Sequence, residues 1–518
     1  MGRRGLPRTV HRSPRLPQGR EFAQTVAESA RDVFHPLIVI TRGLQALAVS
    51  GRRRWAETPR ERRGSAVLLA ASCLAIVALV PYGPPLATVS LLAAGAWAGR
   101  ARRTQRTQDP EPAEAARLQA LYEALVPYLS DPQDPRPLYE HGGSWRKAFD
   151  EYVFDDRGRL AALQLRYPGW FTDGENASRA RIEQLLRLKA GRDREYGFDW
   201  DESANRLCLT VLPPLPTDVC AQRFVTAPGE TVLGFTDPEA VQRTLPVADG
   251  DELYDASPVV WRTGPRSAEP HLLALGRPGA GVTTLLRSVL LQALPHGDAV
   301  IVDGGGTGEY AALAGRHGVL AVESSLTGAL AVLEWAGHET ERRLMAVNSA
   351  RQQGHPVPED ARRPLWIVVD RPVALSRLAA AQGRPDPQML LQVPLFNGRV
   401  ANVTVAIGEQ LDAEGLLDAQ VRTQALARVL LGGVTSEQVL AVLGTPARST
   451  TVDDVPPGRG YARLGSGPVH RLQVPATPDP YDEDAGEAQR QAVLDLLPEA
   501  VFPAVPTTPA YPAADQAT

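Results

Sequence analysis

Apolar positions change their spacing along the chain, and each change predicts a different kind of element. Residues 64–80 and 84–99 form two apolar runs that contain no charged residue and are joined by a turn rich in proline and glycine. Their lengths approach the ~20 residues that cross a bilayer as a helix, and many Ala, Gly and Ser residues let paired helices approach closely. We expect a two-helix transmembrane hairpin over residues 64–99. A buried helical hairpin in a soluble core is the alternative.

Arginine flanks both apolar runs. Residues 1–63 hold fourteen arginines, no lysine and five acidic residues, so this arm carries +9 of a chain whose net charge is −4. The positive-inside rule places both termini in the cytoplasm of a two-pass protein of the cell membrane. The basic arm, with a candidate amphipathic helix at 34–49, is expected to contact membrane lipids, and double-stranded DNA is the second partner considered.

The pattern of residues 100–255 predicts a linker followed by a small α+β domain. The linker, residues 100–130, ends in a helix at 113–129, and the domain spans 131–255. Its strand candidates are 151–155, 159–167, 196–200 and 206–212, with a helix at 177–190. Cys73, Cys208 and Cys220 have neither metal-ligand spacing nor a disulfide framework, which indicates a reducing compartment.

Strands and helices alternate from residue 256 to 476, which predicts a parallel α/β sheet. The expected strands are 271–275, 298–302, 365–370, 401–407 and 428–431, and the expected helices are 283–293 and 329–350. A glycine turn at 304–306 follows the second strand, where Asp303 is expected to be a strand-end cap. Residues 477–518 form an acidic, proline-rich tail with one helix at 486–497.

The first of these strands enters a phosphate-binding loop. From Gly276 to Thr283 the spacing matches G-x-x-x-x-G-K-[ST], except that Val282 occupies the lysine position. Backbone N–H groups and the dipole of the following helix favour a bound phosphate. Thr283 and Asp370, at the tip of a buried strand, are the candidate ligands of Mg²⁺. The candidate ATP-binding residues are Gly276, Arg277, Gly279, Gly281, Thr283 and Thr284.

Five segments in order resemble the motor domain of the FtsK/SpoIIIE superfamily of membrane-anchored DNA translocases, which includes actinobacterial TraB-type transfer proteins and EccC-type secretion ATPases. They are PHLL at 270–273, LEWA with ETERR at 333–343, LWIVVD at 365–370, GRVANVTVA with Gln410 at 398–410, and PGRGYARLG at 457–465. The resemblance implies a P-loop NTPase fold with a RecA-like parallel sheet. It also implies ATP and Mg²⁺ as cofactors, Asp370 as the Walker B aspartate and Gln410 as a candidate sensor.

Two departures from this family affect chemistry. Val282 replaces the lysine that neutralises the β- and γ-phosphates, and Arg371 replaces the acidic residue that positions or activates water. Phosphoryl transfer depends on charge stabilisation and positioning, so these changes predict a pseudo-ATPase with weak Mg-nucleotide binding. An empty loop kept for folding is one alternative. An active motor with relocated groups is another, and its candidate substitutes are Arg277, Arg287, Glu339 and Glu341.

The resemblance implies a role in DNA translocation, transfer or segregation, as a homo-oligomer or together with an active paralogue. The motor segment has no net basic surplus, and no winged-helix DNA-reading module follows it. A second hypothesis is therefore an EccC-like secretion or scaffold protein, whose degenerate ATPase domain docks a secreted or divisome protein.

Overall fold

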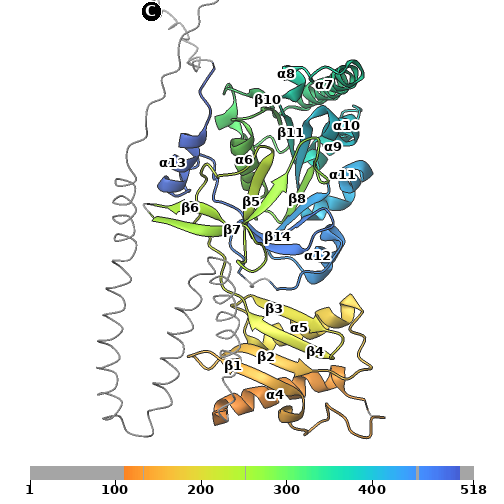
Figure 1. Ribbon diagram of the computed structural model, residues 1–518, viewed down its shortest axis with the longest axis vertical. Coiled ribbons are helices and arrows are strands. Elements are labelled where there is room, and N and C mark those ends of the chain that lie inside the picture. The colour runs from red at the N-terminus through yellow and green to blue at the C-terminus, as the bar shows by residue number, and fades with distance from the viewer. Residues whose placement is uncertain (1–109, 132, 251, 451–453, 502–518) are drawn as a thin grey trace, which may run out of the picture. The chain divides into compact units, whose positions relative to one another are not determined.

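The computed structural model describes residues 110–501, apart from 132, 251 and 451–453 (Figure 1). The basic arm and the transmembrane hairpin predicted over residues 1–99 lie outside the described residues. In the part of the chain that the structure describes, no helix combines the length and the apolar character needed to cross a bilayer.

The small domain is a four-stranded antiparallel sheet with two helices packed against it. It contains α4 (Pro112–Leu129), β1 (Phe149–Phe154), β2 (Leu160–Arg166), α5 (Asn176–Ala190), β3 (Tyr196–Asp201) and β4 (Arg206–Val211). The strand order is β1-β2-β4-β3. Leu118 of α4, Leu163 of β2 and Leu186 of α5 lie in the same buried cluster. Because α4 supplies part of this core, it belongs to the domain and not to the linker that the sequence predicted.

The large domain contains an 11-stranded mixed sheet, in the order β10-β9-β11-β12-β8-β13-β14-β15-β5-β7-β6. Its strands are β5 (Glu230–Thr236), β6 (Leu245–Asp249), β7 (Glu252–Arg262), β8 (Leu272–Gly276), β9 (Asp298–Asp303), β10 (Val319–Glu323), β11 (Leu365–Asp370), β12 (Val403–Gln410), β13 (Ala427–Leu431), β14 (Arg459–Leu464) and β15 (Val469–Gln473). Its helices are α6 (Val282–Ala293), α7 (Leu326–Gln353), α8 (Glu359–Arg362), α9 (Pro372–Ala381), α10 (Gln392–Ala401), α11 (Ala419–Gln424), α12 (Ser436–Leu443) and α13 (Glu487–Leu496).

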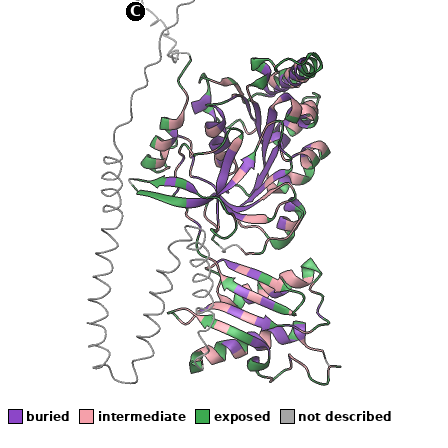
Figure 2. Cartoon of the chain, in the orientation of Figure 1, coloured by how far each residue is buried: buried purple, intermediate pink, exposed green. Residues whose placement is uncertain are grey.

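Successive residues of the central strands face opposite sides of this sheet, as the pleat requires. In β8, Leu272 and Ala274 join a buried cluster with α6, whereas Leu273 and Leu275 join another with α7 and α10. Figure 2 shows these strands buried in the centre of the domain, with exposed residues on the outer helices. The strands therefore read as continuous apolar runs because both faces are covered.

The large domain also differs from the sequence-based prediction. Strands β8 to β13 are parallel, but β13 pairs antiparallel with β14, so the sheet is mixed rather than parallel. Strands β5, β6 and β7 belong to this large sheet, although the division at residue 256 assigned most of their residues to the small domain. The strand expected at 401–407 begins at Val403, because α10 continues to Ala401 and ends at Asn402 in the left-handed conformation.

Candidate nucleotide-binding site

The phosphate-binding loop lies between β8 and α6. The chain turns after Gly276, and α6 begins at Val282. Gly279 and Gly281 have φ angles of 76° and 96°, which glycine adopts without the cost of a clashing Cβ atom. The first N–H groups of a helix have no acceptor within it, so the start of α6 offers donors to an anion.

Val282 fills the space where the family has a lysine. Its side chain is half-buried and packs on the apolar cluster of α6. A Cβ atom on Gly276 would lie 2.6 Å from Cγ2 of Val282, and one on Gly408 would lie 2.8 Å from Cγ1. The two glycines therefore leave room for the valine methyl groups over the ends of β8 and β12. The position contributes packing and no charge toward a phosphate.

Thr283 and Asp370, predicted as metal ligands, lie in contact. The Thr283 hydroxyl donates a 2.7 Å hydrogen bond to Oδ2 of Asp370, and the hydroxyl of Tyr310 donates one of 2.9 Å to the same oxygen. Burial raises the pKa of the Asp370 carboxyl above its usual range, and these two hydrogen bonds oppose the rise. Burial also raises the pKa of Tyr310 well above its usual value. Tyr310 was not foreseen, because no motif surrounds it in the sequence.

The donor set fits Mg²⁺. This ion prefers oxygen ligands and usually takes one or two from protein, with phosphates and water completing its shell. The hydroxyl of Thr283 and the carboxylate of Asp370 are oxygen donors 2.7 Å apart, so both can serve one ion. Among the described residues, no group of three or more His, Cys, Asp or Glu side chains is placed to hold a metal. The remaining ligands would come from nucleotide and water.

Arg371 occupies the position of the missing Walker B acid. It has a φ of 54°, and its amide donates a 2.8 Å hydrogen bond to the carbonyl of Gly408. A Cβ atom on Gly305 would lie 2.6 Å from Cζ of Arg371, so the guanidinium lies across the glycine turn. A cation therefore stands beside Asp370 where the family carries a water-activating carboxylate.

Asp303 organises that glycine turn. Its Oδ1 accepts a hydrogen bond of 3.1 Å from the amide of Gly306, and its Oδ2 accepts one of 2.8 Å from the amide of Gly308. The turn also needs glycine at 304, because a Cβ atom there would lie 2.4 Å from the carbonyl oxygen of Arg371. Asp303 is thus a cap at the end of β9, as the sequence predicted.

The end of β12 contributes a buried carboxylate that the sequence did not indicate. Oε2 of Glu409 accepts a 2.9 Å hydrogen bond from the amide of Val373, and Oε1 accepts one of 2.8 Å from the amide of Gln410. Burial raises the pKa of Glu409 above its usual range. Both oxygens are engaged near the start of α9, so this side chain fixes that helix. Gln410, the candidate sensor, pairs with Gly276 at the start of the loop.

Two of the proposed substitute groups are already engaged. Arg287 is buried and donates to the carbonyl of Thr477 at 2.7 Å and to Glu309 at 2.8 Å. Hydrogen bonds from Arg342 and Arg343 lower the pKa of Glu339 to about 2, which makes it a poor base. Both groups therefore stabilise the fold.

The other two substitutes are exposed. The Glu341 carboxylate lies on the outer face of α7. Arg277, inside the loop, has neither an ion pair nor a side-chain hydrogen bond with any residue that the structure describes, and it can swing toward a bound phosphate.

No protein-family model matches the chain. A stretch of 219 residues, 41% of the chain, is 28% identical to the Ftsk domain-containing protein YdcQ of Bacillus subtilis (strain 168). This similarity agrees with the resemblance of the P-loop domain to the FtsK/SpoIIIE superfamily. The match covers 44% of that relative, so the chain spans less than half of its length.

Solved structures that match part of the chain include the pCW3 conjugation coupling protein TcpA, in a monomer form with ATPγS. It is 16% identical to the chain, with a TM-score of 0.41, over 74% of this chain and 99% of that one. The cytoplasmic domain of the Thermomonospora curvata type VII secretion ATPase EccC is 21% identical, with a TM-score of 0.38, over 56% of this chain and 33% of that one.

Proposed function

We propose that this chain is a membrane-anchored FtsK/SpoIIIE-type protein that binds Mg-nucleotide and hydrolyses it poorly or not at all. The supporting observation is the contact between Thr283 and Asp370, which keeps the metal ligands together beside an intact glycine loop. The same site has Val282 packed in the lysine position and Arg371 in place of the water-activating acid. Binding and catalysis are thereby separated. The retained groups hold the metal, the lost lysine would add charge both to the bound nucleotide and to the transition state, and the lost acid would act on the attacking water alone.

Nucleotide binding without turnover suits a regulatory subunit better than a motor. Mg²⁺ would neutralise phosphate charge at Thr283 and Asp370, and the amides of the loop would hold the phosphates. Without the lysine and the acid, the protein stabilises the transition state little more than it stabilises the bound nucleotide. We infer that nucleotide occupancy changes the conformation of this chain, and that an active paralogue in the same assembly performs the mechanical work.

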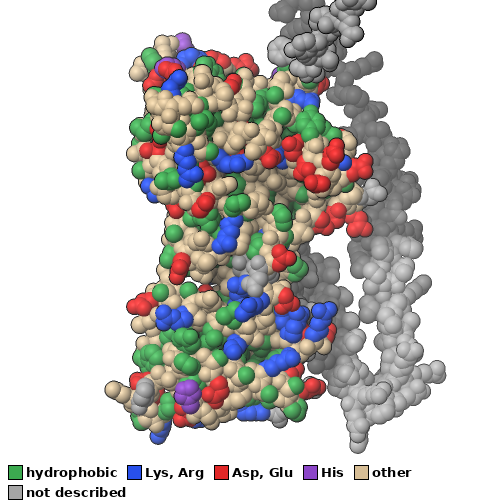
Figure 3. Space-filling view, turned by 180° about the vertical axis from the view of Figure 1, so that it is seen from behind, with side chains coloured by type: hydrophobic (Ala, Val, Ile, Leu, Met, Phe, Trp, Pro, Cys, Tyr) green, Lys and Arg blue, Asp and Glu red, His purple; other side chains and the backbone are tan. Residues whose placement is uncertain are grey.

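Membrane anchoring and a DNA-related role are part of the proposal and rest on the sequence. The apolar runs at 64–99 and the arginines around them support a two-pass anchor with the P-loop domain in the cytoplasm. Contact with DNA is supported by the basic arm more than by the P-loop domain. On the face drawn in Figure 3, acidic and basic side chains are intermixed over the large domain, without a continuous basic stripe.

The second candidate function is a scaffold that docks a protein partner. Three large apolar side chains support it: Trp335 on α7 is 42% exposed, Met389 51% and Phe396 on α10 54%. The elements that carry them pack against one another, and exposed aromatic and methionine side chains are common in protein interfaces. Salt-sensitive DNA binding by the full chain would favour the first function. Protein binding that Phe396→Ser removes, without DNA affinity, would favour the second.

The test uses the full chain in detergent or lipid nanodiscs. Radiolabelled ATP would be followed for binding and for phosphate release, with Thr283→Ala as the variant that removes the metal ligand. We expect saturable binding that Thr283→Ala weakens at least tenfold, and phosphate release no faster than from that variant. Phosphate release that depends on Thr283 would instead identify an active ATPase with relocated catalytic groups. Absence of binding would contradict the proposal.

A further inference from the structure

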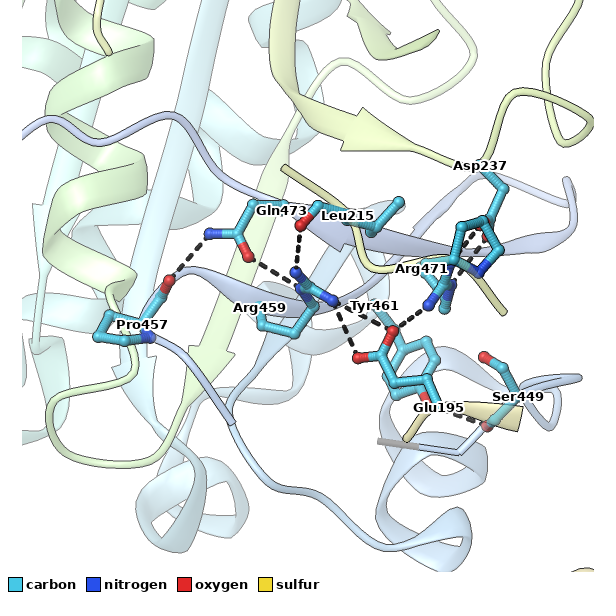
Figure 4. Close-up of polar contacts among 10 residues, drawn as sticks. Glu195, Leu215, Asp237, Ser449, Pro457, Arg459, Tyr461, Arg471 and Gln473 are labelled. Carbon is cyan, nitrogen blue, oxygen red and sulfur yellow. Dashed lines mark hydrogen bonds and ion pairs between the residues drawn. The ribbon is translucent and has the colours of Figure 1, made fainter. Parts of the chain in front are cut away.

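Glu195 joins the small domain to the large one through a buried charge network (Figure 4). It lies immediately before β3, and its carboxylate inserts between two arginines of the large domain. Nη1 of Arg459 donates to its two oxygens at 3.0 and 3.1 Å, and Arg471 also donates to Oε2. All three side chains are at most 5% exposed.

The network is balanced in charge and almost fully hydrogen-bonded. Arg471 also pairs with Asp237 and donates to the carbonyl of Pro213 at 2.9 Å. Nη2 of Arg459 donates to the carbonyl of Leu215 at 2.8 Å. Two acids thus face two arginines. Removing one member of a buried ion pair is costly because the remaining charge has lost both water and partner.

Backbone pairing accompanies this contact. The outer edge of β3 pairs with residues 448–450 of the large domain: the amide of Phe198 donates to the carbonyl of Arg448 at 2.8 Å, and the amide of Thr450 donates to that of Tyr196 at 3.0 Å. These two amides are hydrogen-bonded only while the small domain is docked, so they report docking directly.

Arg459 is also linked to the phosphate-binding loop. Its Nε donates to Oε1 of Gln473 at 2.8 Å, and Nε2 of Gln473 donates to the carbonyl of Pro457 at 2.9 Å. The next residue, Gly458, donates its amide to the carbonyl of Ala280 in the loop at 2.9 Å. A Cβ atom on Gly281 would lie 3.1 Å from the nitrogen of Gly458. The turn at 457–458 therefore packs directly behind the loop.

We propose that Glu195, Arg459 and Gln473 are positioning residues that couple docking of the small domain to nucleotide binding at the loop. The proposal rests on the proposed nucleotide binding and names how it is regulated. A nucleotide that orders residues 280–281 fixes the turn at 457–458, which holds Gln473 and Arg459 in the geometry that receives Glu195. Coupling between two sites is reciprocal. If bound nucleotide raises the equilibrium constant for docking by some factor, then undocking lowers the affinity for nucleotide by the same factor.

The experiment measures both sides of this coupling on the full chain. Hydrogen exchange of the Phe198 and Thr450 amides is followed with and without Mg-ATPγS, and the affinity for Mg-ATPγS is measured by equilibrium titration. We expect nucleotide to slow both amides about tenfold, within the roughly 5–150-fold range of typical couplings. Glu195→Gln should speed both amides without ligand and weaken nucleotide binding by a similar factor. Glu151→Gln removes an exposed charge on β1, at the opposite edge of the small sheet from β3, and is the control that should change neither.

Gln473→Met separates coupling from simple structural support. This variant keeps the Glu195–Arg459 pair and breaks the hydrogen bonds to Arg459 and Pro457. The two amides should stay protected without ligand but no longer respond to nucleotide. The coupling would be overturned if the wild type binds Mg-ATPγS without any change in exchange of the two amides and Glu195→Gln binds it with unchanged affinity. The proposed function would then remain intact. Absence of binding by the wild type would overturn both.

Discussion

The hydroxyl of Thr283 and the carboxylate of Asp370 lie 2.7 Å apart, although 87 positions separate them in the chain. The parallel sheet brings them together, because α6 begins behind the end of β8 while β11 ends two strands away in the same sheet. A hydroxyl and a carboxylate in contact at the end of parallel strands are the ligands that the proposed Mg-nucleotide site requires from the protein. Their retention beside Val282 and Arg371 is the basis of the predictions below.

Val282→Lys should raise the affinity for Mg-ATP about tenfold without restoring hydrolysis. The added ammonium can reach the phosphates, and a charge-assisted contact contributes about 1.5–3 kcal/mol, part of which is offset by lost packing on Gly276 and Gly408. Arg371 would still stand in place of the acid. Val282→Met, which adds length without charge, is the control. Equal affinities for the lysine and methionine variants would contradict this account of position 282.

Gly304→Ala should destabilise the protein far more than Gly305→Ala. A Cβ atom at 304 would lie 2.4 Å from the backbone oxygen of Arg371, which cannot move alone, whereas one at 305 meets the movable guanidinium of Arg371. We expect the free energy of unfolding to fall by about 2–3 kcal/mol in Gly304→Ala and by under about 1 kcal/mol in Gly305→Ala. Urea denaturation measures both, and similar losses would argue against the guanidinium position described above.

Tyr310→Phe should lower the free energy of unfolding by about 1.5–3 kcal/mol, since the lost hydrogen bond goes to a buried carboxylate. Tyr461→Phe is a matched control, because its hydroxyl is also buried but donates to a neutral carbonyl, that of Ser449, at 2.9 Å. That variant should lose only about 0.5–1.5 kcal/mol. The ratio of the two losses, from denaturant midpoints at neutral pH, tests whether Asp370 is charged in the folded protein.

The protein should lose stability at mildly acidic pH because of His271. Its imidazole is buried, accepts a 3.0 Å hydrogen bond from the amide of Val405, and has its pKa lowered by burial to about 4. Between pH 6.5 and 4 the unfolded chain binds a proton that the folded chain does not, so stability present above pH 6.5 falls by about 3 kcal/mol toward pH 4. His271→Asn keeps an acceptor and should flatten this part of the pH profile. An unchanged profile would assign the acid sensitivity to other groups.

Strongly periodic segments were predictable from the sequence. The helix expected at 113–129 is Pro112–Leu129, and the strand expected at 365–370 has those bounds. The pairing of Thr283 with Asp370 followed from the family's motifs. The placement of β5 to β7 did not, because antiparallel strands joined without helices look the same in either domain, and only the pairing of β5 with β15 decides their sheet.

Buried polar partners were the least predictable part of the site. Tyr310 lies in no motif, Glu409 lies within the segment 398–410 but at a position to which the resemblance assigns no role, and each contacts a segment distant in the chain. Glu195 meets Arg459 across 264 positions. A single charged residue in a sequence is normally interpreted as a solvated side chain, because its partner is known only from the folded structure. The contact between the two domains could therefore not be predicted.

The most direct test of the central claim is a titration of the full chain with ATPγS, in the presence of Mg²⁺ and then of EDTA, for the wild type and Thr283→Ala. The account predicts saturable binding that weakens at least tenfold in EDTA and in Thr283→Ala, with no release of phosphate when ATP replaces the analogue. Binding that ignores both Mg²⁺ and Thr283, or no binding at all, would contradict it.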